Sequence, residues 1–195
     1  MSDRAVGVEQ MRERILTAAA EEFAEFGLAG ARVDRIAATA PVNKNSIYRY
    51  FPSKDDLFAA VLERDMSRVL IDVPFTPDDL PGFAAGLFDY ALDHPHLMRM
   101  MAWSGLERPE ATRKETPTMQ AKFATIATAQ ANGRLVDDVA PSIIFTLLTA
   151  IGTAWTSVNP FWGLIDAEAL RDREVLRAVI VRTVERAFEI RDPRG

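Results

Sequence analysis

The stretch VDRIAATAPVNKNSIYRYFPSKDDL, residues 33–57, decides the fold of this chain. Its first apolar positions predict a short helix that ends near Thr39, because Pro41 disfavours a helical conformation at the residue before it. Asn43 can cap a second short helix through its side chain, and Pro52 interrupts that helix. The stretch therefore predicts two short helices joined by a tight turn.

A longer amphipathic helix is predicted on each side of this pair. Upstream, apolar residues recur at helical spacing from Glu9 to Phe26, and a glycine follows as a stop signal. Downstream, Ser53 and Asp56 resemble a capping box at the start of a helix over residues 54–71. Short helices braced in this way form the helix-turn-helix architecture, which presents one helix to the major groove of DNA.

The charge distribution favours a nucleic-acid partner for the same segment. The whole chain carries a net charge of −5, but Ala31 to Lys54 contains five cationic side chains and one aspartate, a net charge of +4. A small basic island on an acidic chain is typical of a DNA-reading segment on a solvated carrier.

The remainder of the chain is also predicted to be helical, since the alternation typical of strands is absent. Further helices are expected over residues 78–93, 95–107, 117–132, 141–158 and 172–191. The predicted fold class is all-α with about nine helices. Its expected parts are an N-terminal three-helix DNA-binding domain in residues 1–53, a bridging helix 54–71, and a C-terminal helical domain in residues 72–195.

Several functional classes are disfavoured. The chain has no cysteine, which excludes disulfides, Cys-ligated metals and a thiol nucleophile. It has no Gly-rich phosphate loop and no nucleophile elbow, so we expect neither an enzyme nor a cofactor. His94 and His96 flank Pro95, which interrupts the shared helical face that a metal site would use, and we therefore expect no metal.

The location is expected to be cytoplasmic and not in a membrane. The N-terminus lacks the apolar core of a secretory signal. The longest uncharged stretch, Val139 to Ile165, contains Pro141, Asn159 and Pro160, which favour a buried helix over a membrane span.

The residues of the helix-turn-helix resemble a known family. Val33 to Ala37, Val42 to Phe51 and Ser53 to Leu57 resemble the DNA-binding domain of the tetracycline-repressor (TetR) family of bacterial transcription regulators. The resemblance is specific over residues 15–62, and it implies a homodimer, a ligand pocket in the C-terminal helices, and release of DNA when an effector binds. Two residues depart from the family pattern. Ala31 stands where a threonine often caps the second helix, and Pro41 stands where glycine is usual. Because the proline ring restricts φ, we expect this turn to lack the positive φ that a glycine would permit.

The resemblance and the residue chemistry together identify candidate contacts to DNA. Asn45 and Ser46 can hydrogen-bond base edges, and Lys44 resembles a residue that contacts phosphate or base. Tyr48 is expected to be exposed and to contact DNA, whereas Tyr50 either packs or makes a contact. The candidate set is Arg32, Lys44, Asn45, Ser46, Tyr48, Arg49, Tyr50 and Lys54.

Large apolar residues in the C-terminal region suggest a pocket for a neutral aromatic or acyl compound, although each taken alone fits an ordinary core. The candidate ligand-binding set is Phe88, Met98, Met101, Trp103, Phe123, Phe145, Thr149, Trp155 and Trp162.

The last two helices, about 141–158 and 172–191, are expected to form the homodimer seam. In the last helix a stripe of residues recurs at helical spacing and is expected to lie in this seam or, as the alternative, in the chain's own core: Leu176, Ile180, Thr183, Ala187 and Ile190. The helix before it carries a row of hydroxyl side chains whose hydroxyls can bond back to backbone carbonyls. This row is expected to face the partner, the ligand pocket or the chain's own core: Ser142, Thr146, Thr149, Thr153 and Thr156.

The sequence therefore predicts a DNA-binding repressor that leaves a palindromic operator when a small, mainly apolar molecule binds. Two alternatives remain open at this point. The first is a helical enzyme or carrier on the same fold, and the second is a regulator without a small-molecule ligand.

Overall fold

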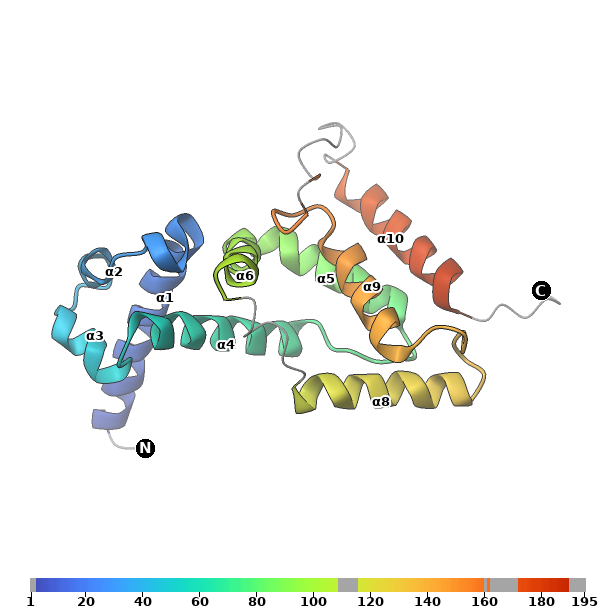
Figure 1. The fold of residues 1–195 in the computed structure, drawn as a ribbon, viewed down its shortest axis with the longest axis horizontal. Helices are drawn as coiled ribbons and strands as arrows, with labels where there is room; N and C mark the ends of the chain where they lie inside the picture. Colours follow the sequence, from blue (N-terminus) through green and yellow to red (C-terminus); the bar gives the residue numbers. More distant parts are fainter. Residues whose placement is uncertain (1–2, 109–115, 160, 162–171, 190–195) are drawn as a thin grey trace. The chain divides into compact units, whose positions relative to one another are not determined.

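The structure is a computed structural model that describes residues 3–108, 116–159, 161 and 172–189. In these residues the chain forms nine α-helices (Figure 1), which confirms the all-α class. The helices are α1 (Asp3–Gly30), α2 (Val33–Thr39), α3 (Lys44–Tyr50), α4 (Lys54–Asp72), α5 (Leu80–Asp93), α6 (Pro95–Glu107), α8 (Pro117–Ala131), α9 (Pro141–Thr153) and α10 (Arg173–Phe188).

The C-terminal ends of α1 and α9 differ from their predicted positions for identifiable reasons. Gly27 has φ 68° and ψ 179°, which are not helical values, so α1 is kinked at this residue. A last helical turn follows the kink and ends at Gly30. α9 ends at Thr153 instead of Val158, and the Asn159 side-chain amide donates a hydrogen bond to the Ala154 carbonyl oxygen at 2.7 Å. In a longer helix the Ala154 carbonyl oxygen would accept a backbone N–H. Here the Asn159 side chain takes the place of that donor.

The described residues form two compact units. The first unit lies within Met1–Arg68 and Pro95–Arg113 and holds α1, α2, α3, α6 and most of α4. The second unit lies within Val69–His94 and Lys114–Gly195 and holds α5, α8, α9 and α10.

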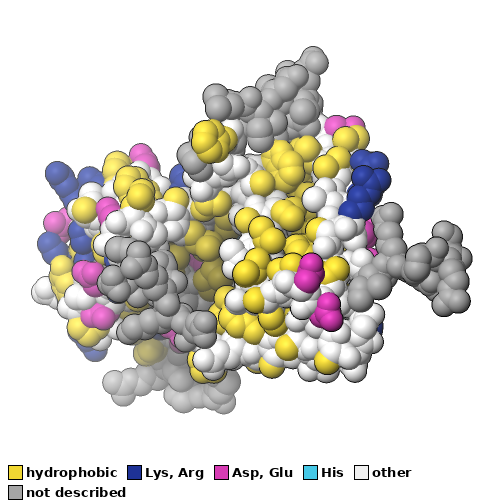
Figure 2. Space-filling model, turned by 45° about the vertical axis from the view of Figure 1, so that its right-hand side comes forward, with side chains coloured by type: hydrophobic (Ala, Val, Ile, Leu, Met, Phe, Trp, Pro, Cys, Tyr) yellow, Lys and Arg dark blue, Asp and Glu magenta, His cyan; other side chains and the backbone are white. Residues whose placement is uncertain are grey.

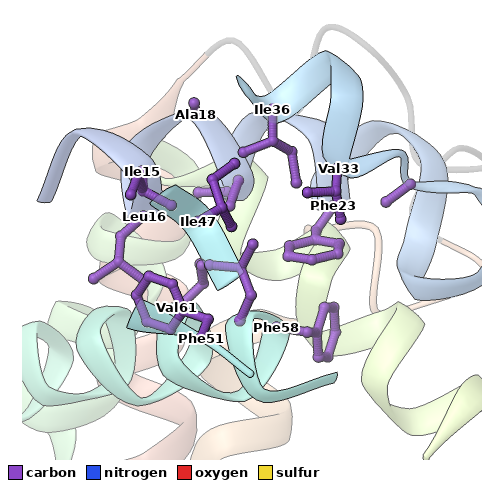
Figure 3. Packing of buried hydrophobic residues seen from close by; sticks show 14 of the residues in the cluster. Ile15, Leu16, Ala18, Phe23, Val33, Ile36, Ile47, Phe51, Phe58 and Val61 are labelled. Carbon is purple, nitrogen blue, oxygen red and sulfur yellow. The ribbon is translucent and has the colours of Figure 1, made fainter. Parts of the chain in front are cut away.

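The first unit has a core built from the apolar faces of its helices (Figure 3). Phe23 of α1 and Phe58 of α4 meet edge to face, with ring centroids 5.0 Å apart, and both side chains are fully buried. Ile36 of α2 and Ile47 of α3 enter the same core. The two short helices are thus held on a scaffold of longer helices by buried residues, which are Val33, Ile36 and Ala37 on α2 and Ile47 on α3. Their other faces remain available.

In the second unit, α5 packs against both α9 and α10. Gly152 allows the close approach of α9 to α5, because a Cβ at this position would lie 2.8 Å from the Cβ of Leu87 and 2.9 Å from the Ala84 carbonyl oxygen. Nearby, the rings of Phe88 and Trp155 meet at 5.7 Å.

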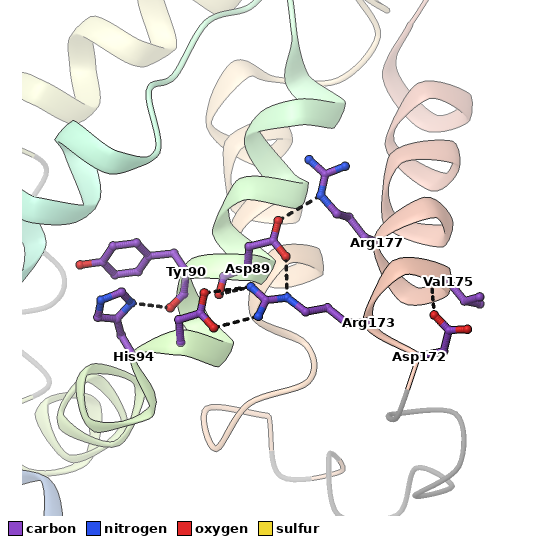
Figure 4. Close-up of polar contacts among 8 residues, drawn as sticks. Asp89, Tyr90, His94, Asp172, Arg173, Val175 and Arg177 are labelled. Atoms are coloured by element: carbon purple, nitrogen blue, oxygen red, sulfur yellow. Dashed lines mark hydrogen bonds and ion pairs between the residues drawn. The ribbon is translucent and has the colours of Figure 1, made fainter.

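Ion pairs attach α10 to α5 (Figure 4). The Arg173 guanidinium donates to the carboxylates of Asp89 and Asp93 at 2.8 Å, and Arg177 donates to Asp89 at 3.0 Å. The hydrogen bonds that Asp93 accepts from Arg173 hold the pKa of Asp93 below its ordinary value. The hydrogen bonds that Arg173 donates to Asp93 and Asp89 raise the pKa of Arg173. Asp172 caps α10 by accepting the backbone N–H of Val175 at 3.0 Å.

The prediction that the apolar stripe of the last helix forms the dimer seam is partly wrong. Leu176 and Ile180 are 9% and 1% exposed, so the chain's own helices already cover them. Thr183 and Ala187 are exposed, and Ile190 lies outside the described residues. Periodicity identified an apolar face correctly, but that face is largely the attachment of α10 to its own unit.

The hydroxyl row on α9 and the turn after it bonds back to the backbone as predicted. Thr146 and Thr153 each donate to the carbonyl oxygen four residues earlier at 2.8 Å. Thr149 and Thr156 donate to the carbonyl three residues earlier, at 2.9 and 2.7 Å. The row runs from exposed at Ser142 to buried at Thr156, so it has no single environment.

In the part of the chain that the structure describes, no helix is both long enough and apolar enough to cross a membrane.

Candidate nucleic-acid interface

The N-terminus of α3 is ordered by two short-range contacts. The Asn43 side chain accepts the backbone N–H of Asn45 at 2.8 Å, which is the predicted cap. Lys44 pairs with Asp34 of α2 at 2.9 Å, and this hydrogen bond raises the pKa of Lys44 above its ordinary value. The ion pair joins the two short helices at the surface, and a phosphate group could compete for the same ammonium.

The candidate DNA contacts on α3 differ in exposure. Asn45, Tyr48 and Arg49 are exposed, with Tyr48 at 42%, while Ser46 is half-buried. Tyr50 is half-buried with its ring centroid 6.4 Å from that of Phe51. Because Ile47 alone on this helix is fully buried among the described residues, the exposed side chains form one outward face.

Two further candidate DNA contacts come from outside α3: Arg32 precedes α2, and Lys54 is the first residue of α4. The Lys54 ammonium donates to the carbonyl oxygens of Ala29 and Ala31, at 3.3 and 3.1 Å, and so satisfies carbonyls near the end of α1. Arg32 is exposed at the N-terminus of α2. Contacts to DNA by either residue remain a prediction.

Glu22 of α1 supplies the anchor that α2 lacks at its own N-terminus. Arg32 is the N-cap residue of α2 and makes no side-chain cap. The Glu22 carboxylate accepts the backbone N–H of Arg32 at 2.7 Å and the Arg35 Nε–H at 2.8 Å. Burial alone would raise the pKa of Glu22, but the hydrogen bonds from Arg35 and Arg32 outweigh it and leave this pKa below its ordinary value.

Glu22 is not among the site residues predicted from the sequence, although the sequence contains a signal for it. Glu22 lies seven residues after Ile15 and three after Ala19, on the apolar face of α1, where a charge is costly without a partner. The Arg35 side chain that pairs with Glu22 is 39% exposed, and its guanidinium also lies 4.2 Å from the Phe26 ring centroid.

The C-terminal end of α6 holds the end of α1 within the first unit. The Glu107 carboxylate accepts the backbone N–H groups of Leu28 and Ala29, at 2.7 and 3.2 Å. The Trp103 ring lies against Gly27, where a Cβ would lie 2.9 Å from the indole. No local pattern could have revealed this contact, because the bonded residues are 79 and 78 positions apart.

The turn between α2 and α3 contains a residue with positive φ, although this residue is Pro41 and not the glycine usual in the family. Pro41 has φ 24°, so the expectation that proline would deny the turn a positive φ is wrong. The ring of proline favours φ near −65°, and the conformation is therefore strained. The backbone N–H of Val42 donates to the Ala37 carbonyl oxygen at 3.0 Å across this turn.

The structure divides the candidate ligand-binding residues between the two units. Three of them lie on α6 in the first unit, where Met98 is buried, Met101 exposed and Trp103 half-buried against Gly27. Those in the second unit are Phe88, Phe123, Phe145, Thr149 and Trp155. Trp162 lies outside the described residues. Ligand binding by any of them remains a prediction.

Two families match the chain. The family described as "Bacterial regulatory proteins, tetR family" matches residues 15–61, and the family described as "Tetracyclin repressor-like, C-terminal domain" matches residues 79–186. The first match covers the helix-turn-helix and the second covers more than half of the chain.

Individual proteins agree with these matches. The chain is 42% identical to the HTH-type transcriptional repressor SCO4008 of Streptomyces coelicolor, over 78% of this chain and 81% of that repressor. It is 28% identical to the HTH-type transcriptional regulator RutR of Escherichia coli, over 94% of this chain and 91% of RutR. The solved structure of SCO4942 from Streptomyces coelicolor superposes with a TM-score of 0.80 at 34% identity, covering 95% of this chain and 99% of SCO4942.

Proposed function

This chain belongs to the TetR family of DNA-binding transcriptional regulators, and from that premise we propose that it is an effector-responsive repressor. It binds an inverted-repeat operator as a homodimer and leaves the DNA when a small, mainly apolar organic molecule binds. Because the family and the relatives are regulators of transcription, the alternative of an enzyme on this fold is set aside.

The outward face of α3 is the observation that carries the proposal. Exposed Asn45, Tyr48 and Arg49 project from a helix that is anchored by Ile47 and capped at its N-terminus. Recognition helices read bases with side chains near their N-termini, which is where Lys44 and Asn45 lie. Lys44 exchanges Asp34 for a phosphate, and Asn45 reads a base edge.

Selection of DNA from a random pool tests this reading directly. We expect enrichment of an inverted repeat whose half-sites lie about one helical turn, or a multiple of it, apart. With roughly six to ten phosphate contacts, affinity should fall by about 10³ to 10⁵ between 50 and 200 mM salt. Tight binding that is insensitive to salt, or no enrichment at all, contradicts the proposal.

Point variants separate the two kinds of contact. Lys44→Ala should weaken binding to all sequences and reduce the salt slope, whereas Asn45→Ala should relax the preference at one base position. Arg99→Ala removes an exposed cation of α6 and serves as the control, with unchanged affinity.

The homodimer seam is assigned to the exposed apolar faces of α9 and α10. Ile143 and Leu147 are 51% and 42% exposed on α9, and Val175 and Val179 are 54% and 37% exposed on α10. Figure 2, which brings forward the side of α8 to α10, shows hydrophobic side chains gathered on this part of the surface. A four-helix seam across a two-fold axis would cover these residues.

Val179→Glu tests the seam, since a glutamate at this 37% exposed position can reach water in the isolated unit but is disfavoured between two subunits. We expect a folded monomer in analytical ultracentrifugation and greatly reduced operator affinity. Leu106→Glu, at a 75% exposed position on α6, is the matched control and should remain dimeric. A dimer of unchanged stability in Val179→Glu contradicts this assignment.

The effector response is assigned to residues 72–195, with residues 1–53 binding DNA and helix 54–71 between them. The aromatic residues around α5, α8 and α9 support an apolar site. The contact of Glu107 with Leu28 and Ala29 ties α6 to the end of α1 and offers a route by which a displaced α6 would disturb the DNA-binding helices.

A regulator without a ligand remains the second candidate. Titration with an apolar fluorophore, followed by release of labelled operator DNA across a chemically broad panel of small molecules, distinguishes the two. If nothing in the panel binds or releases DNA, the effector response is wrong while the DNA-binding role stands.

A further inference from the structure

Lys122 of α8 ends among aromatic rings in the second unit. Its ammonium nitrogen lies 5.1 Å from the ring centroid of Phe145, 5.3 Å from that of Phe75 and 5.4 Å from that of Phe83. The three rings also contact one another, with centroids 5.0 to 5.9 Å apart. They come from three separate elements, which are the segment before α5, α5 itself and α9.

The charge of Lys122 is not matched by a carboxylate in the described part of the chain. Burial is the cause that lowers its pKa, and no neighbouring charge contributes to that shift. The ring faces attract the cation, but an ammonium has three N–H donors and phenyl rings offer no lone pair to accept them. The site therefore presents an ammonium with unused hydrogen-bonding capacity in an apolar setting.

The same site is open to a ligand. Lys122 and Phe75 are only half-buried, whereas Phe83 and Phe145 are 4% and 7% exposed. Phe123 adds a further ring, 5.9 Å from Phe145. An incoming molecule can thus reach the ammonium with one end and contact phenyl rings with its body.

Resting on the effector response proposed above, we propose that Lys122 and its surrounding phenyl rings bind an organic monoanion, namely a carboxylate with an aromatic or acyl body. The carboxylate accepts charge-assisted hydrogen bonds from the ammonium, which are stronger than those between neutral groups. The aromatic or acyl body packs on the phenyl rings and adds apolar burial.

This arrangement also selects against other charges. A cation meets the like charge of Lys122, and a dianion brings two charges to a site with one ammonium. A neutral amide of the same shape keeps the apolar contacts but loses the ionic component. The preference for carboxylate over amide is therefore the signature of the site.

The experiment compares matched probes on the full-length protein. The probes are 4-phenylbutanoate, 4-phenylbutanamide and 4-phenylbutylamine, together with octanoate and octanamide, and binding is measured by isothermal titration calorimetry. In the wild type we expect the carboxylates to bind about 10- to 100-fold more tightly than their amides. The amine should bind most weakly of the phenylbutyl series.

Three variants assign the preference to Lys122. Lys122→Met keeps the length of the side chain and should abolish the carboxylate preference while changing amide affinity by less than about threefold. Lys122→Arg should retain the preference. Arg134→Met removes one exposed cation of the same unit, which pairs with Asp78, and should behave as the wild type.

Each contrary result overturns the proposal. Equal binding of carboxylates and amides, no binding of either carboxylate, tightest binding of the amine, or a preference that survives in Lys122→Met would do so. Release of operator DNA by neutral or cationic molecules in the broader panel would then leave the effector response intact. Failure of the site and failure of the proposed function are thus distinguishable.

Discussion

Replacing Glu22 with alanine is expected to destabilise the DNA-binding helices by about 2 to 3 kcal/mol. The Glu22 side chain is 8% exposed, and its carboxylate accepts a hydrogen bond from the backbone N–H of Arg32. Without it, the N-terminus of α2 loses both this acceptor and the tether to Arg35. The change should therefore loosen the position of α2, and with it α3, relative to α1.

The magnitude follows from the exposure of the two partners. Loss of an acceptor from a part-buried N–H costs about 1 to 3 kcal/mol. The Arg35 side chain is 39% exposed, so water can solvate it when its partner is gone, and its share is closer to the roughly 0 to 1 kcal/mol of a surface pair. Glu22→Gln keeps an oxygen acceptor for the N–H and loses only the charge, so it should cost about 1 kcal/mol.

The charge component has a defined pH dependence. Because the folded pKa of Glu22 lies below its ordinary value of 4.5, the ionised form stabilises the fold above that value. This contribution is lost as the pH falls through the lowered folded pKa. The difference between wild type and Glu22→Gln should therefore be full at neutral pH and shrink as the pH is lowered below 4.5.

The assay is urea unfolding of the full-length protein combined with hydrogen exchange on peptides that cover α2 and α3. Hydrogen exchange locates the effect, since the two units need not unfold as one. Glu21→Ala is the matched control, because Glu21 is exposed and adjacent, and its change should lie within about 0.5 kcal/mol of the wild type. Equal effects of the two alanine variants, or a Glu22→Gln difference that does not change with pH, would refute the reasoning.

Three further predictions concern backbone strain and packing, and each is tested by urea unfolding. Pro41→Gly should stabilise the protein by about 1 kcal/mol, because relief of strain of about 1 to 3 kcal/mol exceeds the added chain entropy of about 0.4 to 1 kcal/mol; a loss of stability would contradict this. Gly152→Ala should destabilise it by about 1 to 3 kcal/mol through the clash with Leu87, and an unchanged midpoint would place α9 differently. Ile180→Ala should lower the free energy of unfolding by about 2 to 5 kcal/mol, and Val179→Ala on the exposed face should lower it much less. Similar losses in the two variants would contradict the division of α10 into an inner and an outer face.

The sequence was sufficient for features that depend on neighbouring residues. Proline and capping residues determine where the chain can begin or leave a helix, and α6 has the bounds predicted from Pro95 to Glu107. The cap of α3 by Asn43, the exposure of Tyr48 and the back-bonded hydroxyls of α9 all follow from short-range geometry. The family resemblance of residues 33–57 was carried by the same local pattern.

Only the tertiary structure decided which surface covers each helical face. Periodicity identified the apolar stripe through Leu176 and Ile180, but a stripe looks the same whether its own chain or a partner covers it. Glu22, Glu107 and Lys122 acquire their roles from residues on other elements, and the pairing of Glu107 with Leu28 spans 79 positions. Such contacts depend on how helices approach in space, and the spacing of residues along one helix contains no record of the helix that packs against it.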